Sequence, residues 1–244
     1  MLAFYRPGQW LAAALPALLP CSCALCGQLS EGVVCAPCRQ DAVSVRSRCR
    51  RCANPLAAGD AAAGRDCGAC SAAAPAFDAT IAAADYQAPL DQLLLQLKFG
   101  ACLPLAGWFA SVLRDAVLHE QRAGVGLPDL LAPVPLGRRR LVERGFNQAL
   151  EVARPLSRLL GVPLDARLAA RVLETAPQSA LAPADRAANV RAAFAVAPRV
   201  AGLHVGIVDD VMTSGRTLDA LARSLKRAGA RRVTNYVVAR TPPG

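Results

Sequence analysis

Aromatic side chains make up only 5% of this 244-residue chain, and lysine is nearly absent, with two residues against 26 arginines. The shortage of aromatics leaves few platforms on which the bases of single-stranded nucleic acid could stack. Hydrophobic residues still reach 54% and charged residues only 19%, which excludes a disordered chain and predicts a core of Ala, Leu and Val. The two histidines, His119 and His204, stand outside every motif and are expected to be structural.

Long hydrophobic runs are also missing. The longest apolar stretch near the N-terminus, Trp10 to Leu19, has about ten residues and contains Pro16, so it is too short to cross a bilayer. A signal peptide is the alternative interpretation, because Arg6 precedes this stretch and Cys21 follows it. An A-x-A-like cleavage site is absent, and we therefore expect a cytoplasmic protein without a membrane span.

The formal net charge is +10, which is typical of proteins that handle polyanions such as nucleic acid, acidic lipid or phosphorylated small molecules. If eight cysteine thiolates held two Zn²⁺ ions, the net charge would fall to about +6. The basic excess would then lie after residue 75, because residues 1–75 carry seven Arg against four acidic residues.

Nine of the ten cysteines fall between positions 21 and 70, and eight of them form four C-x-x-C pairs. The pairs are Cys23/Cys26, Cys35/Cys38, Cys49/Cys52 and Cys67/Cys70. A C-x-x-C turn places two thiolates on one side of a tight knuckle, and two facing knuckles supply a tetrahedral Cys₄ site. The spacing predicts one or two structural zinc ions in a double zinc ribbon, with metal in place of a hydrophobic core.

Two other interpretations of the cysteines stay open. A disulfide framework would need an oxidising compartment, and redox chemistry at a C-x-x-C would need a βαβ context that this segment lacks. Cys21 is left over from the four pairs, and it could exchange roles with Cys23 as a metal ligand.

After residue 76 the pattern changes to alternating strands and helices, which predicts an α/β domain over residues 77–244 behind the N-terminal segment 1–76. The expected elements are a strand at 77–86, helices at 89–97 and 104–118, a strand at 129–135, a Gly/Arg-rich loop, and a helix from about 147. Pro155 predicts a kink or a restart in that last helix.

A second strand–helix–strand unit closes the chain. The apolar run 203–208 is typical of a buried parallel strand, a helix follows from Gly215 to Gly229, and 233–239 is the next strand. Ligands bind in such folds at the carboxyl end of a central strand, which is where the segment from Asp209 to Thr217 is expected.

This segment has the chemistry of a phosphate site. The turn Thr213-Ser214-Gly215-Arg216-Thr217 offers consecutive backbone N–H groups, three hydroxyls and a helix N-terminus, all of which favour a phosphate dianion. Asp209 and Asp210 cannot bind phosphate, but they can accept hydrogen bonds from sugar hydroxyls and attract Mg²⁺. A helix N-cap is the plainer alternative.

The run from Val205 to Thr217 resembles the signature of type I phosphoribosyltransferases, which binds the ribose and 5′-phosphate of phosphoribosyl diphosphate. Pro133-Val-Pro135, Arg144-Gly-Phe-Asn-Gln148 and the segment from Gln178 through Arg186 and Asn189 to Phe194 narrow the resemblance to the ComF competence family. It implies a parallel-sheet phosphoribosyltransferase-like domain behind zinc ribbons, a loop at 133–148 facing the diphosphate, and a mobile flap at 174–189.

The resemblance also implies site roles. Asp209 and Asp210 would act in catalysis and hold the ribose, and Arg144 would bind the diphosphate. Lys98 is a further candidate, because an arginine-rich chain retains a compact ammonium there, in the part that covers the sugar site in this family. The full ligand-binding set is Asp209, Asp210, Thr213, Ser214, Gly215, Arg216, Thr217, Arg144 and Lys98.

Two functions are compatible with this set of ligand-binding residues. The first is a phosphoribosyltransferase that uses phosphoribosyl diphosphate with Mg²⁺ and an unidentified nitrogen acceptor, in the context of DNA uptake. The second is a non-catalytic module of the transformation machinery that binds single-stranded DNA under control of the same ligand. Other competence proteins are the partners that the resemblance implies, and the sequence does not decide whether catalysis occurs.

Overall fold

The structure, a computed structural model, describes residues 21–43, 46–56, 66–122, 124–172 and 193–242. The apolar stretch at 10–19 and the whole predicted flap at 174–189, with Gln178, Arg186 and Asn189, lie outside the described residues. Among the helices that are described, none is both long and apolar enough to span a membrane.

The centre of the molecule is a four-stranded parallel sheet in the order β3-β8-β7-β4. Its strands are β3 (Ala79–Asp85), β8 (Arg232–Arg240), β7 (His204–Met212) and β4 (Leu130–Pro133). β3 and β8 are buried along almost their whole length, as expected for parallel strands covered on both faces. The α/β fold class predicted from the sequence is confirmed.

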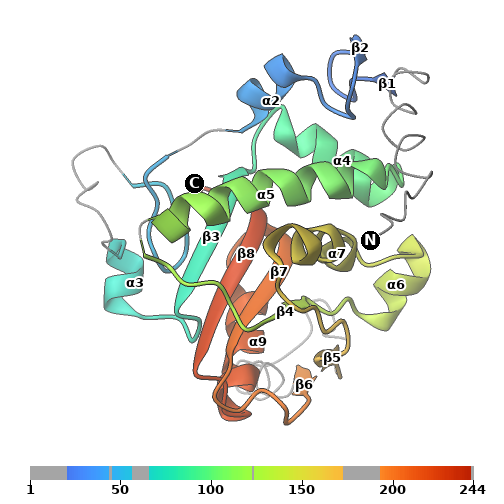
Figure 1. Ribbon diagram of the computed structural model, residues 1–244. Helices are drawn as coiled ribbons and strands as arrows, with labels where there is room; N and C mark the ends of the chain where they lie inside the picture. The colour runs from blue at the N-terminus through green and yellow to red at the C-terminus, as the bar shows by residue number, and fades with distance from the viewer. Residues whose placement is uncertain (1–20, 44–45, 57–65, 123, 173–192, 243–244) are drawn as a thin grey trace, which may run out of the picture.

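Helices cover both faces of this sheet (Figure 1). On one face lie α5 (Pro104–Arg122) and α7 (Gln148–Leu160), with α4 (Leu90–Phe99) leading into α5; α9 (Arg216–Arg227) lies on the other face. Each face has its own apolar core, and the short antiparallel pair β5 (Ala169–Arg171) and β6 (Phe194–Val196) joins the α9 side. The two cores fix the sheet between two helical layers.

The four knuckles form two small ribbons at the N-terminal end of the described chain. The first contains β1 (Cys21–Ser22), β2 (Leu29–Ser30) and α2 (Ala36–Ala42); the second contains α3 (Gly68–Ala72). The first ribbon packs with the α4 and α5 core, and the second packs with the core on the α9 face. The two ribbons therefore pack with different cores of the domain, and the domain boundary at residue 76 stays a prediction.

Three features of the local structure differ from expectation. The restart considered at Pro155 does not occur, because Val152, Ala153 and Leu156 on the inner face of α7 are buried in the core; a kink there stays a prediction. Part of the predicted Gly/Arg-rich loop forms a short helix, α6 (Arg138–Arg144).

The third difference concerns the strand before the phosphate turn. β7 does not end at Val208 but continues to Met212, because β8 pairs with it as far as Arg240. Asp209 and Asp210 therefore lie inside a paired strand, which fixes their backbone more firmly than a loop would.

Candidate functional site

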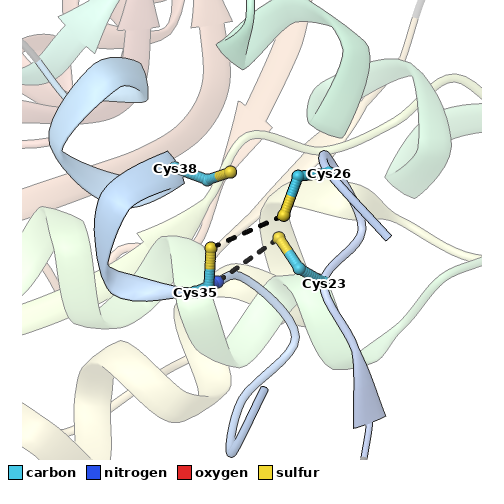
Figure 2. A group of neighbouring side chains, drawn as sticks. All are labelled: Cys23, Cys26, Cys35 and Cys38. Atoms are coloured by element: carbon cyan, nitrogen blue, oxygen red, sulfur yellow. Dashed lines mark hydrogen bonds between the residues drawn. The ribbon is translucent and has the colours of Figure 1, made fainter. Parts of the chain in front are cut away.

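The eight paired cysteines form two clusters, Cys23/Cys26/Cys35/Cys38 and Cys49/Cys52/Cys67/Cys70, and the four sulfur atoms of each lie within 4.8 Å of one another. Figure 2 shows the first cluster with its four side chains turned toward a common centre. The Sγ atoms of Cys26 and Cys35 are 3.8 Å apart, and those of Cys52 and Cys67 are 3.6 Å apart. Tetrahedral zinc with Zn–S bonds of about 2.3 Å places its sulfurs roughly 3.8 Å apart.

Backbone donors prepare each cluster for a cation. The N–H of Cys35 donates to Cys23 Sγ at 3.4 Å, and the N–H of Cys67 donates to Cys49 Sγ at 3.2 Å. Burial raises the pKa of the Cys23 thiol, but backbone hydrogen bonds outweigh burial and lower that pKa to about 6. Burial and sulfur neighbours raise the pKa of Cys52 to about 11, so the full set of thiolates needs a metal.

These observations support structural zinc over the alternatives. Bonded sulfurs in a disulfide would be about 2 Å apart, whereas every described cysteine is a free thiol. Cys21 is exposed and belongs to neither cluster, so the structure places the ligand role on Cys23.

The predicted phosphate turn lies at the carboxyl end of β7 and leads into α9. Gly215 precedes the helix with φ of +74°, and a Cβ at this position would lie 2.6 Å from Met212 Cε. This conformation and this close approach both favour glycine. Within the described chain, no acceptor takes the backbone N–H groups of Thr213, Ser214 and Gly215. Three consecutive open donors at a helix N-terminus form an anion-binding concavity.

Asp209 and Asp210 stand just before this turn and are half-buried. Burial raises the pKa of the Asp209 carboxyl well above its usual range, and the charge of Asp210 adds to this effect. The N–H of Asp210 donates to Asp209 Oδ1 at 2.9 Å, which opposes the shift but does not cancel it. The pair therefore carries electrostatic strain that a cation or hydroxyl donors would relieve.

Lys98, at the end of α4, reaches this acidic pair. Its Nζ lies 2.9 Å from Asp210 Oδ2, and both side chains are largely buried. The positive charge of Lys98 also lowers the pKa of Asp209. The structure thus brings together two residues 112 positions apart that sequence reasoning had assigned separately to the ligand site.

Arg144, the last residue of α6, contacts the C-terminal end of α4. Its guanidinium carbon lies 5.3 Å above the ring of Phe99, the residue after Lys98, and that ring is 71% exposed. Asn147 explains part of the R-G-F-N-Q motif, because its side chain caps α7 and donates to Val134 O at 3.0 Å. The motif therefore holds the 133–148 segment against the strand end while Arg144 faces the neighbouring helix.

Sequence reasoning missed Arg240, the last residue of β8. It is 7% exposed, and its guanidinium donates to Met212 O at 3.0 Å and to the carbonyl of Thr213 in the phosphate turn. Its Nε donates to Cys52 O of the second ribbon at 2.9 Å. The sequence did show an arginine at the end of an apolar strand. Nothing near Arg240 in the sequence indicated that it would contact Cys52, Met212 or Thr213.

Basic residues gather near the end of α9, and several of them form ion pairs or hydrogen bonds within the protein. Lys226 Nζ lies 2.7 Å from Asp78 and Arg223 lies 2.7 Å from Asp219, while Arg231 donates to Gly202 O. These ion pairs reduce the charge available to a phosphate backbone on this face. Arg138 and Arg140 of α6 are exposed, and the same helix carries Arg144 of the candidate site.

The raised pKa of Asp209 leads to a prediction about stability. A carboxyl whose pKa is raised on folding stabilises the folded state only while protonated, so wild-type stability falls as the pH rises through its folded pKa. We expect Asp209→Asn to be more stable than wild type by about 1 kcal/mol near pH 8, or roughly 2–4 °C in Tm. The difference should close below about pH 4, where an unfolded Asp is also protonated.

Thermal melts of both proteins by circular dichroism across this pH range would measure the difference at each pH. Zinc is lost from both proteins at low pH, so its effect on Tm cancels when the two proteins are compared at the same pH. An Asp209→Asn protein that is less stable than wild type at pH 8 would contradict the strain described for this pair.

Two family models match different parts of the chain. A double zinc ribbon domain matches residues 14–71, and a phosphoribosyl transferase domain matches residues 147–244. The DNA utilization protein YhgH of Salmonella typhimurium is 36% identical over 227 residues, which cover 91% of this chain and 98% of the relative. Competence protein F of Haemophilus influenzae is 32% identical over 178 residues, which cover 71% and 78% respectively.

Among solved structures, a purine phosphoribosyltransferase from Pyrococcus horikoshii is similar over 55% of this chain and 83% of its own. The TM-score is 0.33 and the sequence identity 20%.

Proposed function

Because this chain belongs to the ComF competence family, in which a double zinc ribbon precedes a phosphoribosyltransferase domain, we propose that it binds phosphoribosyl diphosphate with Mg²⁺. The observation that carries this proposal is the run of open N–H groups at Thr213, Ser214 and Gly215, directly after an acidic pair on β7. The open N–H groups can donate to a phosphate, and the two carboxylates can accept hydrogen bonds from sugar hydroxyls.

Different residues would bind different parts of the ligand. The turn and the N-terminus of α9 would hold the 5′-phosphate, and the carboxylates of Asp209 and Asp210 would accept hydrogen bonds from the ribose hydroxyls. Arg144 presents a planar guanidinium that can bind two diphosphate oxygens at once. Carboxylate oxygens also suit Mg²⁺, which would offset the charge of the diphosphate.

In the proposed reaction, the bond from the ribose C1 carbon to the diphosphate breaks and a bond from C1 to a nitrogen acceptor forms. Positive charge develops on the sugar as the diphosphate leaves, and the nearby carboxylates stabilise that charge. The protein contributes mainly orientation and electrostatic stabilisation, because no described residue needs to form a covalent intermediate.

Diphosphate release with phosphoribosyl diphosphate, Mg²⁺ and a panel of nucleobases tests the transferase function directly. Calorimetry with phosphoribosyl diphosphate alone tests binding. Turnover with one acceptor would establish an enzyme, whereas tight binding without turnover would favour the second candidate, a ligand-regulated module that binds single-stranded DNA. Failure to bind at all would contradict the proposal.

The second candidate is favoured by the names of the relatives, a DNA utilization protein and a competence protein. If it is correct, DNA affinity should fall steeply with salt, with a log–log slope of about −0.7 per phosphate neutralised. Fluorescence anisotropy with a labelled oligonucleotide at several salt concentrations would measure that slope. Because several α9 cations are paired, we expect α6 substitutions to reduce the slope more than α9 substitutions.

Lys98 provides a separate prediction. We expect Lys98→Arg to weaken phosphoribosyl diphosphate binding by roughly 1 kcal/mol, or about fivefold, because the wider guanidinium cannot keep the same contact with Asp210. Calorimetry would measure the change. Lys226→Arg is the matched control, since it alters the only other lysine, which pairs with Asp78. Equal affinity of Lys98→Arg and wild type would remove Lys98 from the site.

A further inference from the structure

Arg240 joins two parts of the molecule that the proposed function treats separately. One guanidinium donates to Cys52 O in a knuckle of the second cysteine cluster and to the carbonyls of Met212, Thr213 and Thr241. Cys52 and Arg240 are 188 positions apart in the sequence. Their contact lies at the carboxyl ends of β7 and β8, beside the candidate phosphate turn.

The contact with the turn controls the direction of its amides. In a planar trans peptide the C=O of one residue and the N–H of the next point in opposite directions. When Arg240 holds the Met212 and Thr213 carbonyls on the buried side, the N–H groups of Thr213 and Ser214 must point the opposite way. These are two of the three open donors on which phosphate binding is proposed to depend.

The stability of the buried Arg240 charge also depends on the ribbon. The residue is 7% exposed, and among the described residues no carboxylate oxygen lies within ion-pair distance of its guanidinium. Four thiolates around one Zn²⁺ carry a net charge of −2, so a loaded cluster supplies the missing negative charge next to Cys52. Without metal, the buried cation would lose this compensation.

Arg240 is not needed to dock the ribbon. Arg48, in the same ribbon, pairs with the buried Asp85 of β3 at 2.7 Å. The N–H of Thr80 in β3 also donates to Arg50 O at 3.0 Å. These contacts attach the ribbon to the sheet without Arg240. The Arg240 guanidinium is therefore available to hold the carbonyls of the turn.

We propose that Arg240 is a positioning residue that couples zinc in the second cluster to the phosphate-binding turn, so that metal loading there raises affinity for phosphoribosyl diphosphate. This inference rests on the proposed function and extends it with a regulatory role for one of the two ribbons. The thermodynamic coupling is reciprocal, and ligand binding therefore raises the zinc affinity of the second cluster by the same factor.

The first test compares Arg240→Lys and Arg240→Gln with wild type, using calorimetry with phosphoribosyl diphosphate and Mg²⁺ on proteins shown to contain two zinc ions. Affinity should fall at least about tenfold in both variants, because neither can hold both carbonyls and Cys52 O at once. Arg39→Gln is the matched control: Arg39 ties the first ribbon to Asp115 of α5 at 2.6 Å and does not touch the turn. Wild-type affinity in a folded Arg240→Lys protein would overturn the inference.

The second test needs no substitution at Arg240, so it decides the question even if those variants fail to fold. Zinc affinity of the wild-type protein is measured by equilibrium competition with a chelator that does not bind Mg²⁺, with and without phosphoribosyl diphosphate. Cys35→Ser identifies the step that belongs to the first cluster. Saturating ligand should raise zinc affinity at the second cluster by at least about fivefold.

The outcomes separate the two proposals. If the wild-type protein does not bind phosphoribosyl diphosphate, the proposed function fails. If it binds and the zinc affinity of the second cluster is unchanged, the coupling is wrong while the proposed function stands.

Discussion

Replacing Asp209 and Asp210 together by asparagine is expected to abolish measurable binding of phosphoribosyl diphosphate while leaving the protein folded. Each carboxylate would lose a charge-assisted hydrogen bond to the ribose or its attraction for Mg²⁺, worth about 1.5–3 kcal/mol. Two such losses correspond to a decrease of roughly 10²–10⁴ in affinity. Calorimetry with Mg²⁺ present would measure it.

Folding should survive because Asp209 contributes strain, and an asparagine at 210 can still accept a hydrogen bond from Lys98 through its amide oxygen. Burial and mutual repulsion raise the pKa of Asp209, and an asparagine at 209 can still accept the hydrogen bond from residue 210 through its amide oxygen. Asp115→Asn is the matched control, since Asp115 is an exposed carboxylate that pairs with Arg39 and Arg114 away from the site. An unchanged affinity in the double variant would remove the acidic pair from the ligand site.

Removal of zinc is expected to have the largest effect on stability. Structural zinc supplies on the order of 10 kcal/mol to small metal-dependent modules, and neither ribbon has an apolar core of its own to replace it. Chelation should therefore expose residues 21–72 to proteolysis. Limited proteolysis with mass spectrometry would locate the cleavage sites, and metal analysis should give two zinc ions per chain before chelation.

The two clusters should not contribute equally to the rest of the fold. Cys49, Cys52 and Cys70 are buried with Phe77 in the core on the α9 face, whereas Cys26 of the first cluster is exposed. We expect loss of the second cluster to lower the Tm of the whole protein by several degrees more than loss of the first.

Two cysteines make a matched pair for this comparison. Cys35 and Cys67 are both half-buried and each precedes the short helix of its own ribbon, α2 or α3. Thermal melts of Cys35→Ser and Cys67→Ser should show the larger decrease for Cys67→Ser. Equal decreases would indicate that both ribbons are peripheral to the sheet.

The features that the sequence predicted correctly depend on short spacings. A C-x-x-C pair places two sulfurs on one knuckle whatever surrounds it, so the eight zinc ligands could be identified before the fold. The last helix, from Arg216 to Arg227, was predicted from its leucines at helical spacing, and β8 from its apolar residues. The turn between β7 and α9 followed from Gly215, because a left-handed backbone position has a clear residue preference.

Predictions failed where tertiary packing outweighed a local preference. Pro155 disfavours a continuous helix by removing one backbone hydrogen bond, but the buried inner face of α7 stabilises the helix across it. β7 extends past Val208 because pairing with β8 satisfies the backbone of two acidic residues that have poor strand propensity.

The sequence by itself determined the pairing of the eight cysteines into knuckles, the alternation of strands and helices, and the glycine turn between β7 and α9, since each depends on residues within a few positions of one another. Only the tertiary structure decided which residues meet at the site: Lys98 with Asp210, and Arg240 with Cys52 O and the turn. The strand order brings these residues together, and the acceptors of Arg240 are backbone carbonyls, which every residue carries and no sequence pattern can mark.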